Sequence, residues 1–500
     1  MNINEFPDDI RENIIPHPYG SMFYRCLACN REFDIANLLY TCPSCGGILM
    51  LHQRPSEKIQ NIDGDAWRKI FDYRRMINRS SLRGIFRFYE FIAPIIPLES
   101  IVYLGEGSTP LVEANTNMEQ EIGLPVYFKY EGLNPSLSFK DRGMACALSF
   151  LNYLAAKKGV KNILAICAST GDTSASAALY SAYLTGLVKS AVILPKGKVT
   201  SQQLSQPIVS GATVFEIPGV FDDCMKVVEE LSEKYNVALL NSKNSWRILG
   251  QESFAFEVAQ DFDYNVSDKV IVVPIGNAGN ISAIMSGFLK FFKANIISGL
   301  PKILGVQSEH ANPVYRYYLE EDTPMRAFKP VHVKPSVAQA AMIGNPVSMP
   351  RVIDIVKEYN QVAGQKRVFV AQVTEQEIMD ATMAANKNGH IVCTQGGESM
   401  AGLMGAREMG IVSDEETGIL DSTAHSLKFS NFQQMYLEDT FPEGFGVKTN
   451  KEYRNSPVSI IPEGIKKMPG TGGPLTDKDL QIFVRATAET IANILSLNKL

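Results

Sequence analysis

The sequence of 500 residues lacks several features that would assign it to a specialised class of protein. It has no excess of positive charge, because 48 basic side chains stand against 53 acidic ones, and this argues against a protein that coats nucleic acid. It also has no long uninterrupted apolar run. Lys290 and Lys293 interrupt the apolar stretch ISAIMSGFLKFFKANIISGL, so we expect no segment that spans a membrane.

A secretory signal and a histidine metal motif are missing as well. The first residues, MNINEFPDDIREN, are polar and acidic, unlike a signal peptide, so we predict a cytoplasmic protein. In that reducing compartment the eight cysteines would not form disulfides. The six histidines show no H-x-x-x-H or H-E-x-x-H spacing. Only His425 lies inside a motif described below, where it either orients a turn or belongs to the core.

Four of the eight cysteines are concentrated in one short segment, CLACNREFDIANLLYTCPSCGG. Their spacing is C-x2-C-x12-C-x2-C, which presents two pairs of thiolates to one tetrahedral ion. Four unrelated buried cysteines are the alternative, but two matched pairs so close together favour a structural Zn²⁺ site. The predicted ligands are Cys26, Cys29, Cys42 and Cys45, within a zinc-ribbon module over residues 1–55. Only Arg25 and Arg31 lie beside it, which gives little support to nucleic-acid binding.

From about residue 100 onward, short apolar runs alternate with segments of helical periodicity. This alternation favours doubly wound, mostly parallel α/β sheets. The predicted strands are 162–169, 190–196, 212–219, 237–242, 270–276, 302–309 and 390–397. Residues 52–67 read as a polar linker, and a final helix is expected at about 476–497, after an irregular segment at 441–475.

Two strand-to-helix junctions have the composition of anion sites. At the first, VIVVPIG runs into NAGN, where Gly276 and Gly279 let backbone N–H groups converge on a phosphate monoester at a helix start. The loop has neither G-x-G-x-x-G nor a Walker lysine, which disfavours a dinucleotide or ATP. At the second, CASTGDTSAS offers hydroxyls and amides that suit a carboxylate. A plain turn at the first junction and a simple helix cap at the second are the alternatives.

A lysine in an apolar setting completes the pattern. Lys140 follows Phe139 in SLSFKDRG, and an ammonium group is costly there unless it is used. A cofactor that carries both a phosphate and an aldehyde would explain the lysine and the first junction together. Pyridoxal 5'-phosphate is such a cofactor, and it binds one lysine as a Schiff base. The alternative is a lysine that extends to solvent and pairs with Asp141.

Five motifs, EGLNPSLSFKDRG, ASTGDTSAS, PIGNAGNISA, IGNPVSMPR and STAHSLKF, occur in the order and approximate spacing seen in threonine synthases. Over roughly residues 80–430 the sequence resembles this family, which has the tryptophan-synthase-β fold. The resemblance implies an α/β protein with two doubly wound parallel-sheet domains of PLP fold type II beside the zinc ribbon. The implied boundaries are 56–139 for a linker and the start of the large domain, 140–245 for a small mobile domain, and 246–500 for the large domain with its C-terminal extension.

The resemblance also implies roles for individual residues. Lys140 would bind pyridoxal phosphate, with Thr423 facing the pyridine nitrogen and Asp172 near the phenolic oxygen. The cofactor phosphate would be held by Gly276, Asn277, Ala278, Gly279 and Asn280. Ser169 and Thr170 would take the substrate carboxylate. The implied substrate, O-phosphohomoserine, needs a second anion site, and Ser242 and Arg247 with the help of Thr173 are expected to form it.

Two residues depart from the family pattern. Leu137 stands where a glycine is usual, and Asp172 stands where many relatives have asparagine. An ionised Asp172 would repel the phenolic oxygen, so it is expected to be protonated or turned away.

The implied reaction converts O-phosphohomoserine and water into threonine and phosphate. The rivals are a serine or threonine deaminase, a phosphoserine-type β-replacement enzyme, and a zinc-ribbon regulatory protein with an inert enzyme-like body. Arg247 discriminates, because a deaminase needs no second phosphate site. A homodimer is one candidate assembly, and neither nucleic acid nor a membrane is an expected partner.

Overall fold

The computed structural model describes residues 3–161, 163–169, 171–197, 199, 201–219, 221–235, 237–320, 323–465, 468–470 and 474–498. The chain forms two compact units, Met1–Asn450 and Lys451–Leu500. The first unit contains three sheets and the residues discussed below as a candidate site. The predicted boundaries within this unit, at residues 55, 139 and 245, stay predictions.

A six-stranded sheet with the order β12-β11-β10-β13-β5-β4 forms the larger α/β layer. Its strands are parallel except for β4, which pairs antiparallel with β5 at one edge. The bounds are β4 Leu111–Glu113, β5 Val126–Tyr130, β10 Lys269–Pro274, β11 Lys302–Ser308, β12 Val368–Val373 and β13 Thr417–Ser422. The central strand β10 is buried from Val270 to Pro274, as expected for a parallel strand that is covered on both faces.

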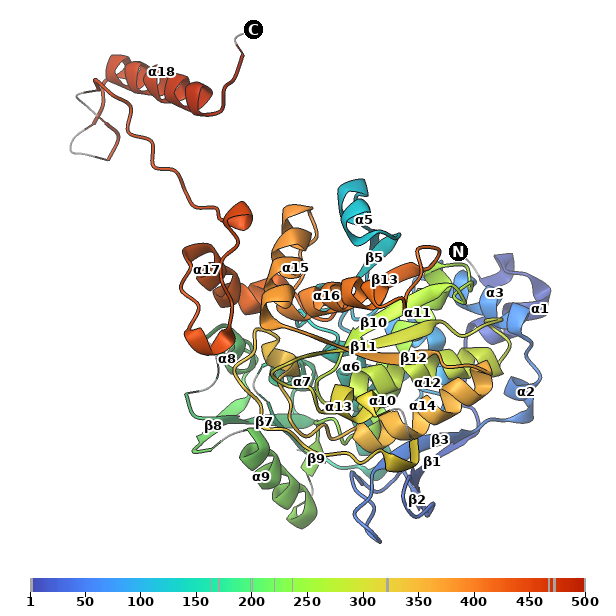
Figure 1. Ribbon diagram of the computed structural model, residues 1–500. Coiled ribbons are helices and arrows are strands. Elements are labelled where there is room, and N and C mark those ends of the chain that lie inside the picture. The colour runs from blue at the N-terminus through green and yellow to red at the C-terminus, as the bar shows by residue number, and fades with distance from the viewer. Residues whose placement is uncertain are drawn as a thin grey trace. The chain divides into compact units, whose positions relative to one another are not determined.

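Helices cover this sheet on its two sides. Helix α16 (Thr394–Glu408) lies across β10 to β13, whereas α12 (Gly279–Lys293) and α14 (Met349–Ala363) lie on the other side (Figure 1). The other helices of this part are α11 Ser253–Asp261, α13 Pro313–Leu319, α15 Glu375–Lys387 and α17 Ser430–Glu438. The apolar stretch that contains Lys290 and Lys293 is the amphipathic helix α12, and its two lysines fall in the last turn.

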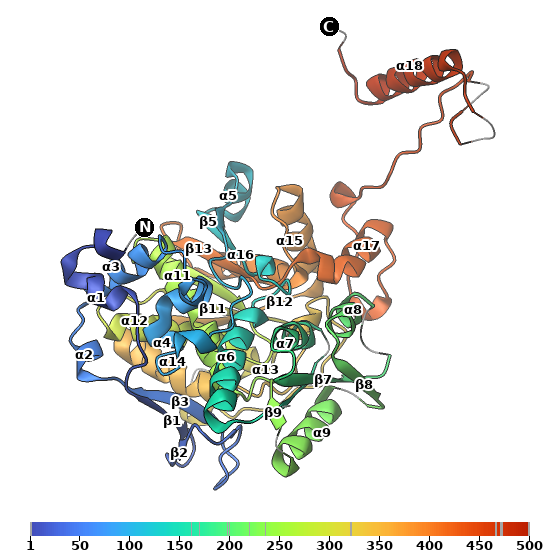
Figure 2. The same ribbon diagram turned by 180° about the vertical axis from the view of Figure 1, so that it is seen from behind.

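The second α/β layer is a four-stranded parallel sheet with the order β8-β7-β6-β9. Its strands are β6 Ile163–Ala168, β7 Val188–Pro195, β8 Thr213–Ile217 and β9 Val237–Leu239. The helices between them are α7 Asp172–Tyr183, α8 Ser201–Val209 and α9 Phe221–Lys234. Helix α6 (Lys140–Lys158) precedes this sheet and α10 (Ser245–Gln251) follows it, and these two helices pack against each other. Figure 2 shows α6 beside α7. The two parallel sheets confirm the predicted α/β class.

The N-terminal region holds a small antiparallel sheet with the order β2-β1-β3. Its strands are β1 Ser21–Cys26, β2 Glu32–Asp34 and β3 Leu49–Arg54, preceded by α1 Asp8–Ile14. The region continues through α2 Glu57–Gln60, α3 Gly64–Arg74, α4 Tyr89–Ile92 and α5 Thr116–Ile122. The polar linker predicted at 52–67 is wrong, because β3 enters this segment and α3 begins in it. The Asp63 side chain caps α3 by accepting a hydrogen bond from Ala66 N, and Trp67 is buried.

One predicted strand, 390–397, is also wrong. Helix α16 begins at Thr394, inside this run. A Cβ atom on Gly397 would lie 2.0 Å from Thr382 Oγ1 of α15, so the glycine allows the two helices to approach closely. Residues 390–393 (HIVC) therefore belong to the turn before a tightly packed helix.

The second unit contains helix α18 (Asp477–Ile494), which matches the helix expected at about 476–497. Thr476 caps it by accepting a hydrogen bond from Asp479 N. None of the helices in the described part of the chain combines the length and apolar character that a bilayer crossing requires.

Candidate active site

Lys140 is the first residue of α6, and its Nζ lies 3.7 Å from the centre of the Phe139 ring. Burial lowers the pKa of this amine to about 7, and the nearby Asp172 carboxylate opposes only part of that shift. Asp141 does not pair with it. Instead, Asp141 accepts hydrogen bonds from Ser136 N and Ser136 Oγ, each at 2.6 Å. The alternative of a lysine paired with Asp141 is therefore wrong.

A pocket extends from Lys140 between residues of both parallel sheets. It brings together the predicted Ser169, Asp172, Thr173, Ser242, Arg247, Gly276, Asn277, Ala278, Gly279, Asn280 and Thr423. Thr170 lies outside the described residues. Residues separated by more than two hundred positions thus line one cavity with Lys140.

The 276–280 loop joins β10 to the 15-residue helix α12. A Cβ on Gly276 would lie 3.1 Å from the Cα of Ala341, so the backbone is close-packed there. Ala278 adopts φ +60°, a left-handed conformation that costs a side-chain-bearing residue about 1 kcal/mol or more. Strain of this kind occurs in turns that must orient several backbone N–H groups toward one point. The loop fits a phosphate group at a helix start.

The 169–173 loop caps α7 and also faces the pocket. Ser169 Oγ accepts hydrogen bonds from Gly171 N and Ser174 N, both at 3.0 Å. Ser169 Oγ donates no hydrogen bond to another described residue, and Thr173 lines the same pocket. The cap and the anion-binding role are therefore compatible.

Asp172 has a partner that the sequence analysis did not identify. Lys428 Nζ lies 2.8 Å from Asp172 Oδ1, and both side chains are 5% exposed. Lys428 also donates to the Ser136 carbonyl at 2.8 Å. An ionised Asp172 is thus balanced by a buried ammonium group, which is a third arrangement besides a protonated or an outward-turned carboxyl.

Arg247 lies in α10 and is 1% exposed, with Ser242 beside it in the wall of the pocket. Its Nη1 donates to the Leu240 carbonyl at 3.0 Å, whereas Nε has no hydrogen-bond partner in the described part of the chain. Among the residues that the structure describes, it forms no ion pair. Burial lowers the pKa of this guanidinium to about 10, which leaves it charged at neutral pH. A buried, unpaired cation that faces a pocket suits an anionic ligand.

Thr423 follows β13 and is joined to the lysine segment through the backbone. Phe139 N donates to the Thr423 carbonyl at 2.9 Å, and His425 N donates to the Leu137 carbonyl at 3.1 Å. The His425 ring accepts a hydrogen bond from Leu427 N at 3.2 Å, so it caps the following turn. These bonds place the Thr423 hydroxyl and the Lys140 amine at the same pocket.

Leu137 adopts φ +66°. This left-handed conformation is the one that glycine tolerates without steric cost, which gives a physical reason for the glycine usual at this place. The leucine therefore keeps the turn but holds it under strain.

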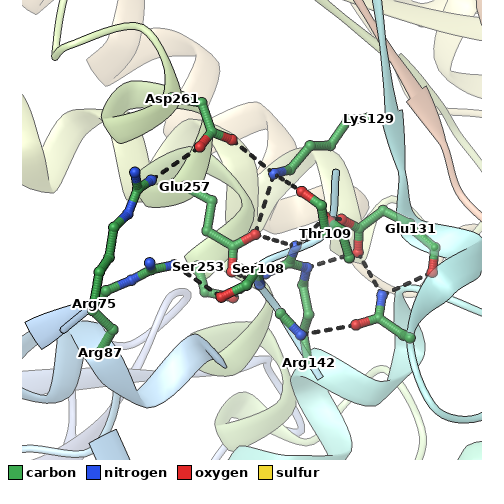
Figure 3. Close-up of polar contacts among 12 residues, drawn as sticks. Arg75, Arg87, Ser108, Thr109, Lys129, Glu131, Arg142, Ser253, Glu257 and Asp261 are labelled. Atoms are coloured by element: carbon green, nitrogen blue, oxygen red, sulfur yellow. Dashed lines mark hydrogen bonds and ion pairs between the residues drawn. The ribbon is translucent and has the colours of Figure 1, made fainter. Parts of the chain in front are cut away.

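A buried ionic network holds the first turn of α6 through Arg142 (Figure 3). Arg142 Nε and Nη2 donate to Glu131, and its Nη1 and Nη2 donate to Glu257, at 2.7 to 2.9 Å. Lys129 lies 3.3 Å from Glu257 and 3.0 Å from Asp261. Burial alone would raise the pKa of Glu257, but Arg142 and Lys129 hold it well below its usual range. The network joins α6 to α11 and β5.

The four clustered cysteines converge as the sequence predicts. Their Sγ atoms all lie within 4.8 Å of one another, with Cys26 and Cys45 at 3.5 Å and Cys29 and Cys42 at 3.6 Å. All eight cysteines of the chain are free thiols. The separations are those of four thiolates around one tetrahedral ion with metal–sulfur bonds of about 2.3 Å.

Several residues of the pocket escaped the sequence analysis: Asn241, Gln251 and Gln395 line it, and Lys428 supports it through Asp172. Asn241 holds β9 to β6, since its side chain both donates to and accepts from the Ala168 backbone. Lys428 was visible as the basic residue of STAHSLKF, but nothing in that motif indicates that its partner is Asp172.

Sequence similarity to known proteins extends over most of the chain. Residues 102–420 match the model of the family described as pyridoxal-phosphate dependent enzymes. A threonine synthase of Methanocaldococcus jannaschii is 36% identical over 416 residues, which cover 81% of this chain and 93% of the relative. A chloroplastic threonine synthase 2 of Arabidopsis thaliana is 34% identical over 440 residues, covering 86% of this chain and 82% of the relative.

Comparison with solved structures shows the fold. The crystal structure of threonine synthase from Escherichia coli matches with a TM-score of 0.64 at 20% identity, covering 85% of this chain and 94% of that one. The processed form of threonine deaminase isoform 2 from Solanum lycopersicum matches with a TM-score of 0.54 at 18% identity, covering 70% and 92%. Enzymes with different reactions therefore share this architecture, and the residues of the pocket have to distinguish them.

Proposed function

The chain belongs to the threonine synthase family of pyridoxal-phosphate dependent enzymes, and we propose on this basis that it converts O-phosphohomoserine and water into L-threonine and phosphate. The substrate would bring a phosphate of its own into a pocket that already has a phosphate cradle for the cofactor. Two separate anion sites are therefore required.

The observation that carries the proposal is the buried Arg247. It lines the pocket beside Ser242 without a carboxylate partner among the described residues, and it belongs to a different segment from the 276–280 loop. A planar guanidinium can grip two phosphate oxygens at once, and Ser242 and Thr173 supply hydroxyl donors nearby. A deaminase acting on serine or threonine would leave this buried charge unmatched.

The remaining roles follow from chemistry at the pocket. Pyridoxal phosphate, when bound, supplies an electron sink for carbanion chemistry. The amides of Gly276 to Asn280 would hold its phosphate, and Lys140 would bind it covalently. Because burial brings the pKa of Lys140 to about 7, this amine can accept and return a proton near neutral pH, as removal of an α-proton and then a β-proton requires.

Two polar side chains would tune the cofactor ring. Thr423 offers a hydroxyl to the ring nitrogen, which does not keep that nitrogen protonated as a carboxylate would. Asp172, balanced by Lys428, would lie at the phenolic oxygen. Ser169 and its neighbouring amides would bind the substrate carboxylate, and Thr170 is assigned to the same role.

For the N-terminal module we propose structural Zn²⁺ bound by Cys26, Cys29, Cys42 and Cys45. Four thiolates would complete the coordination and leave no open position, so the ion would act in folding and not in the reaction. A cytoplasmic location and a homodimeric assembly stay predictions from the sequence.

The test is incubation of the purified protein with O-phosphohomoserine, with phosphate and threonine measured together. Equal amounts of both products are expected. Serine and threonine are tested separately as substrates, and formation of pyruvate from serine or of 2-oxobutyrate from threonine as the main activity would favour a deaminase. The bound cofactor should absorb at about 410 nm, and Lys140→Ala should remove both the activity and the covalent attachment seen by mass spectrometry after borohydride reduction. Absence of the absorption band from the unsubstituted protein would support the inert-body alternative.

A further inference from the structure

Arg351, in the first turn of α14, is 0% exposed and has no carboxylate partner in the described part of the chain. Its Nη1 donates to the Ser242 carbonyl at 2.8 Å and to Ser348 Oγ at 3.0 Å. Its Nη2 donates to the carbonyls of Leu49 at 3.1 Å and Lys243 at 3.2 Å. One guanidinium thus joins three segments that are far apart in sequence.

The Leu49 carbonyl connects this junction to the four-cysteine module, by which we mean residues 21–54. Leu49 begins β3 and pairs with Cys26 across the small sheet. Its carbonyl also accepts a hydrogen bond from Ser245 Oγ at 2.7 Å. On the neighbouring strand, Tyr24 accepts a hydrogen bond from Trp246 Nε1 at 3.1 Å. The module is therefore bonded to both Ser245 and Trp246.

Four of these hydrogen bonds involve residues 242–247, which we call the clamp segment. The clamp segment carries Ser242 and Arg247 into the pocket. Arg351 lies behind it as a second buried guanidinium without a carboxylate partner among the described residues. Burial lowers the pKa of Arg351 to about 10, so that it too is charged at neutral pH. Two unmatched positive charges beside one turn favour a ligand with two negative charges, such as a phosphate monoester.

We propose that Arg351 is a positioning residue for the substrate phosphate, which bonds the clamp segment to the four-cysteine module and makes phosphate affinity depend on the module. The identity of the substrate rests on the proposed function, but the anion site and its support do not. Arg351 does not line the pocket, so it acts through the carbonyls of Ser242 and Lys243. Loss of the module's metal would loosen Leu49 and Ser245, and the clamp would lose its geometry.

The experiment compares Arg351→Gln and Arg351→Lys in the full chain with cofactor bound. Affinity for inorganic phosphate is measured by titration calorimetry, and KM and kcat are measured for O-phosphohomoserine. We expect Arg351→Gln to weaken phosphate binding and raise KM by about tenfold, with kcat within about twofold, because a clamp that binds the substrate and the transition state equally changes KM alone. Arg351→Lys keeps the charge but loses the bridge, so a loss of about threefold is expected.

Arg74→Lys is the matched control. Arg74 is equally buried but bonds Glu90 and the carbonyls of Asn13 and Ile14, none of which lines the pocket. This change should lower the melting temperature without altering phosphate affinity. If Arg351→Gln does not fold, the comparison of Arg351→Lys with Arg74→Lys decides. A folded Arg351 variant with unchanged phosphate affinity and KM would overturn the proposal.

A second measurement tests the link to the module. Zinc is removed from the holoenzyme with a chelator, its content is measured, and the phosphate titration is repeated before and after zinc is restored. Weaker phosphate binding that recovers with zinc is expected, whereas affinity that is independent of metal content would refute the link. A protein that binds phosphate in this Arg351-dependent way but makes no threonine would contradict the proposed function and leave this inference standing.

Discussion

Two arginines near Lys140 are buried to the same extent but have opposite surroundings. Arg142 and Arg247 are each 1% exposed. Arg142 is held by the carboxylates of Glu131 and Glu257, whereas the described residues offer Arg247 one carbonyl and leave its Nε without a hydrogen bond. Since desolvation of a charge is costly wherever it occurs, a paired buried charge belongs to the architecture, and an unpaired one at a pocket indicates a binding site for an anion. The contrast distinguishes Arg142, which supports the site, from Arg247, which is available to bind a ligand in it.

The largest effect is expected on stability, when Arg142 in the supporting ionic network is replaced. Arg142→Met should destabilise the protein by about 3–5 kcal/mol, because Glu131 and Glu257 would stay buried without their main counter-charge. Urea unfolding measures this loss. The folded fraction should keep a KM close to that of the unsubstituted enzyme. A variant with unchanged stability and a raised KM would show that Arg142 belongs to the ligand site, and the distinction between the two arginines would fail.

Arg247→Met is the matched change on the ligand side. We expect KM for O-phosphohomoserine to rise by about a hundredfold, or about 2.7 kcal/mol, because a charge-assisted phosphate contact is lost. The free energy of unfolding without ligand should stay the same or increase, since an unpaired buried charge is removed. Steady-state kinetics and urea unfolding of the same preparation check both values. Destabilisation comparable to that of Arg142→Met would contradict the assignment.

The shifted pKa of the Lys140 amine should be visible in the pH dependence of both cofactor uptake and stability. With a pKa near 7 in place of the usual 10.5, Lys140 is neutral above pH 7, and the rate of cofactor uptake by the cofactor-free protein should rise up to about pH 7 and then level off. The unfolded chain would bind one more proton than the native protein between these values. Stability of the cofactor-free protein should therefore rise with pH across this window, relative to Lys140→Met. Uptake that keeps rising to pH 10 would mean that the amine is not desolvated.

The smallest effect is expected at Leu137, where the supporting backbone is strained. Leu137→Gly should stabilise the protein by about 0.5 kcal/mol, because relief of the left-handed conformation exceeds the entropy that glycine adds to the unfolded chain. Thermal unfolding of the two proteins measures it. A loss of more than about 1 kcal/mol would show that packing of the leucine side chain outweighs its strain.

The sequence predicted the parts of this protein that local patterns encode. Local residue types were enough to predict three features, namely the 276–280 loop, the cluster of four cysteines and the final helix. Strand–helix alternation gave the α/β class in the same way. The strand predicted at 390–397 was wrong because a helix begins at Thr394, and Gly397 of that helix packs against α15. The sequence of one segment does not show which other segment packs against it.

Pairings between distant segments could not be predicted. Lys428 meets Asp172, Arg142 meets Glu257, and Arg351 meets Leu49, and each pair is separated by more than one hundred residues. A charged side chain in a motif indicates that it needs a partner. The motif does not indicate where in the sequence that partner lies. The motifs therefore located the pocket, while its electrostatic balance became visible only in three dimensions.

The backbone bonds between residues 137–139 and 423–425 have a lasting consequence. Hydrogen bonds between main-chain groups survive the replacement of any side chain that does not disturb the fold. Descendants of this chain can therefore alter the chemistry at either segment, one residue at a time, while the amine and the hydroxyl opposite it keep their mutual alignment. New reactions can therefore evolve at this pocket by side-chain replacement, without a change in the backbone that holds the two segments together.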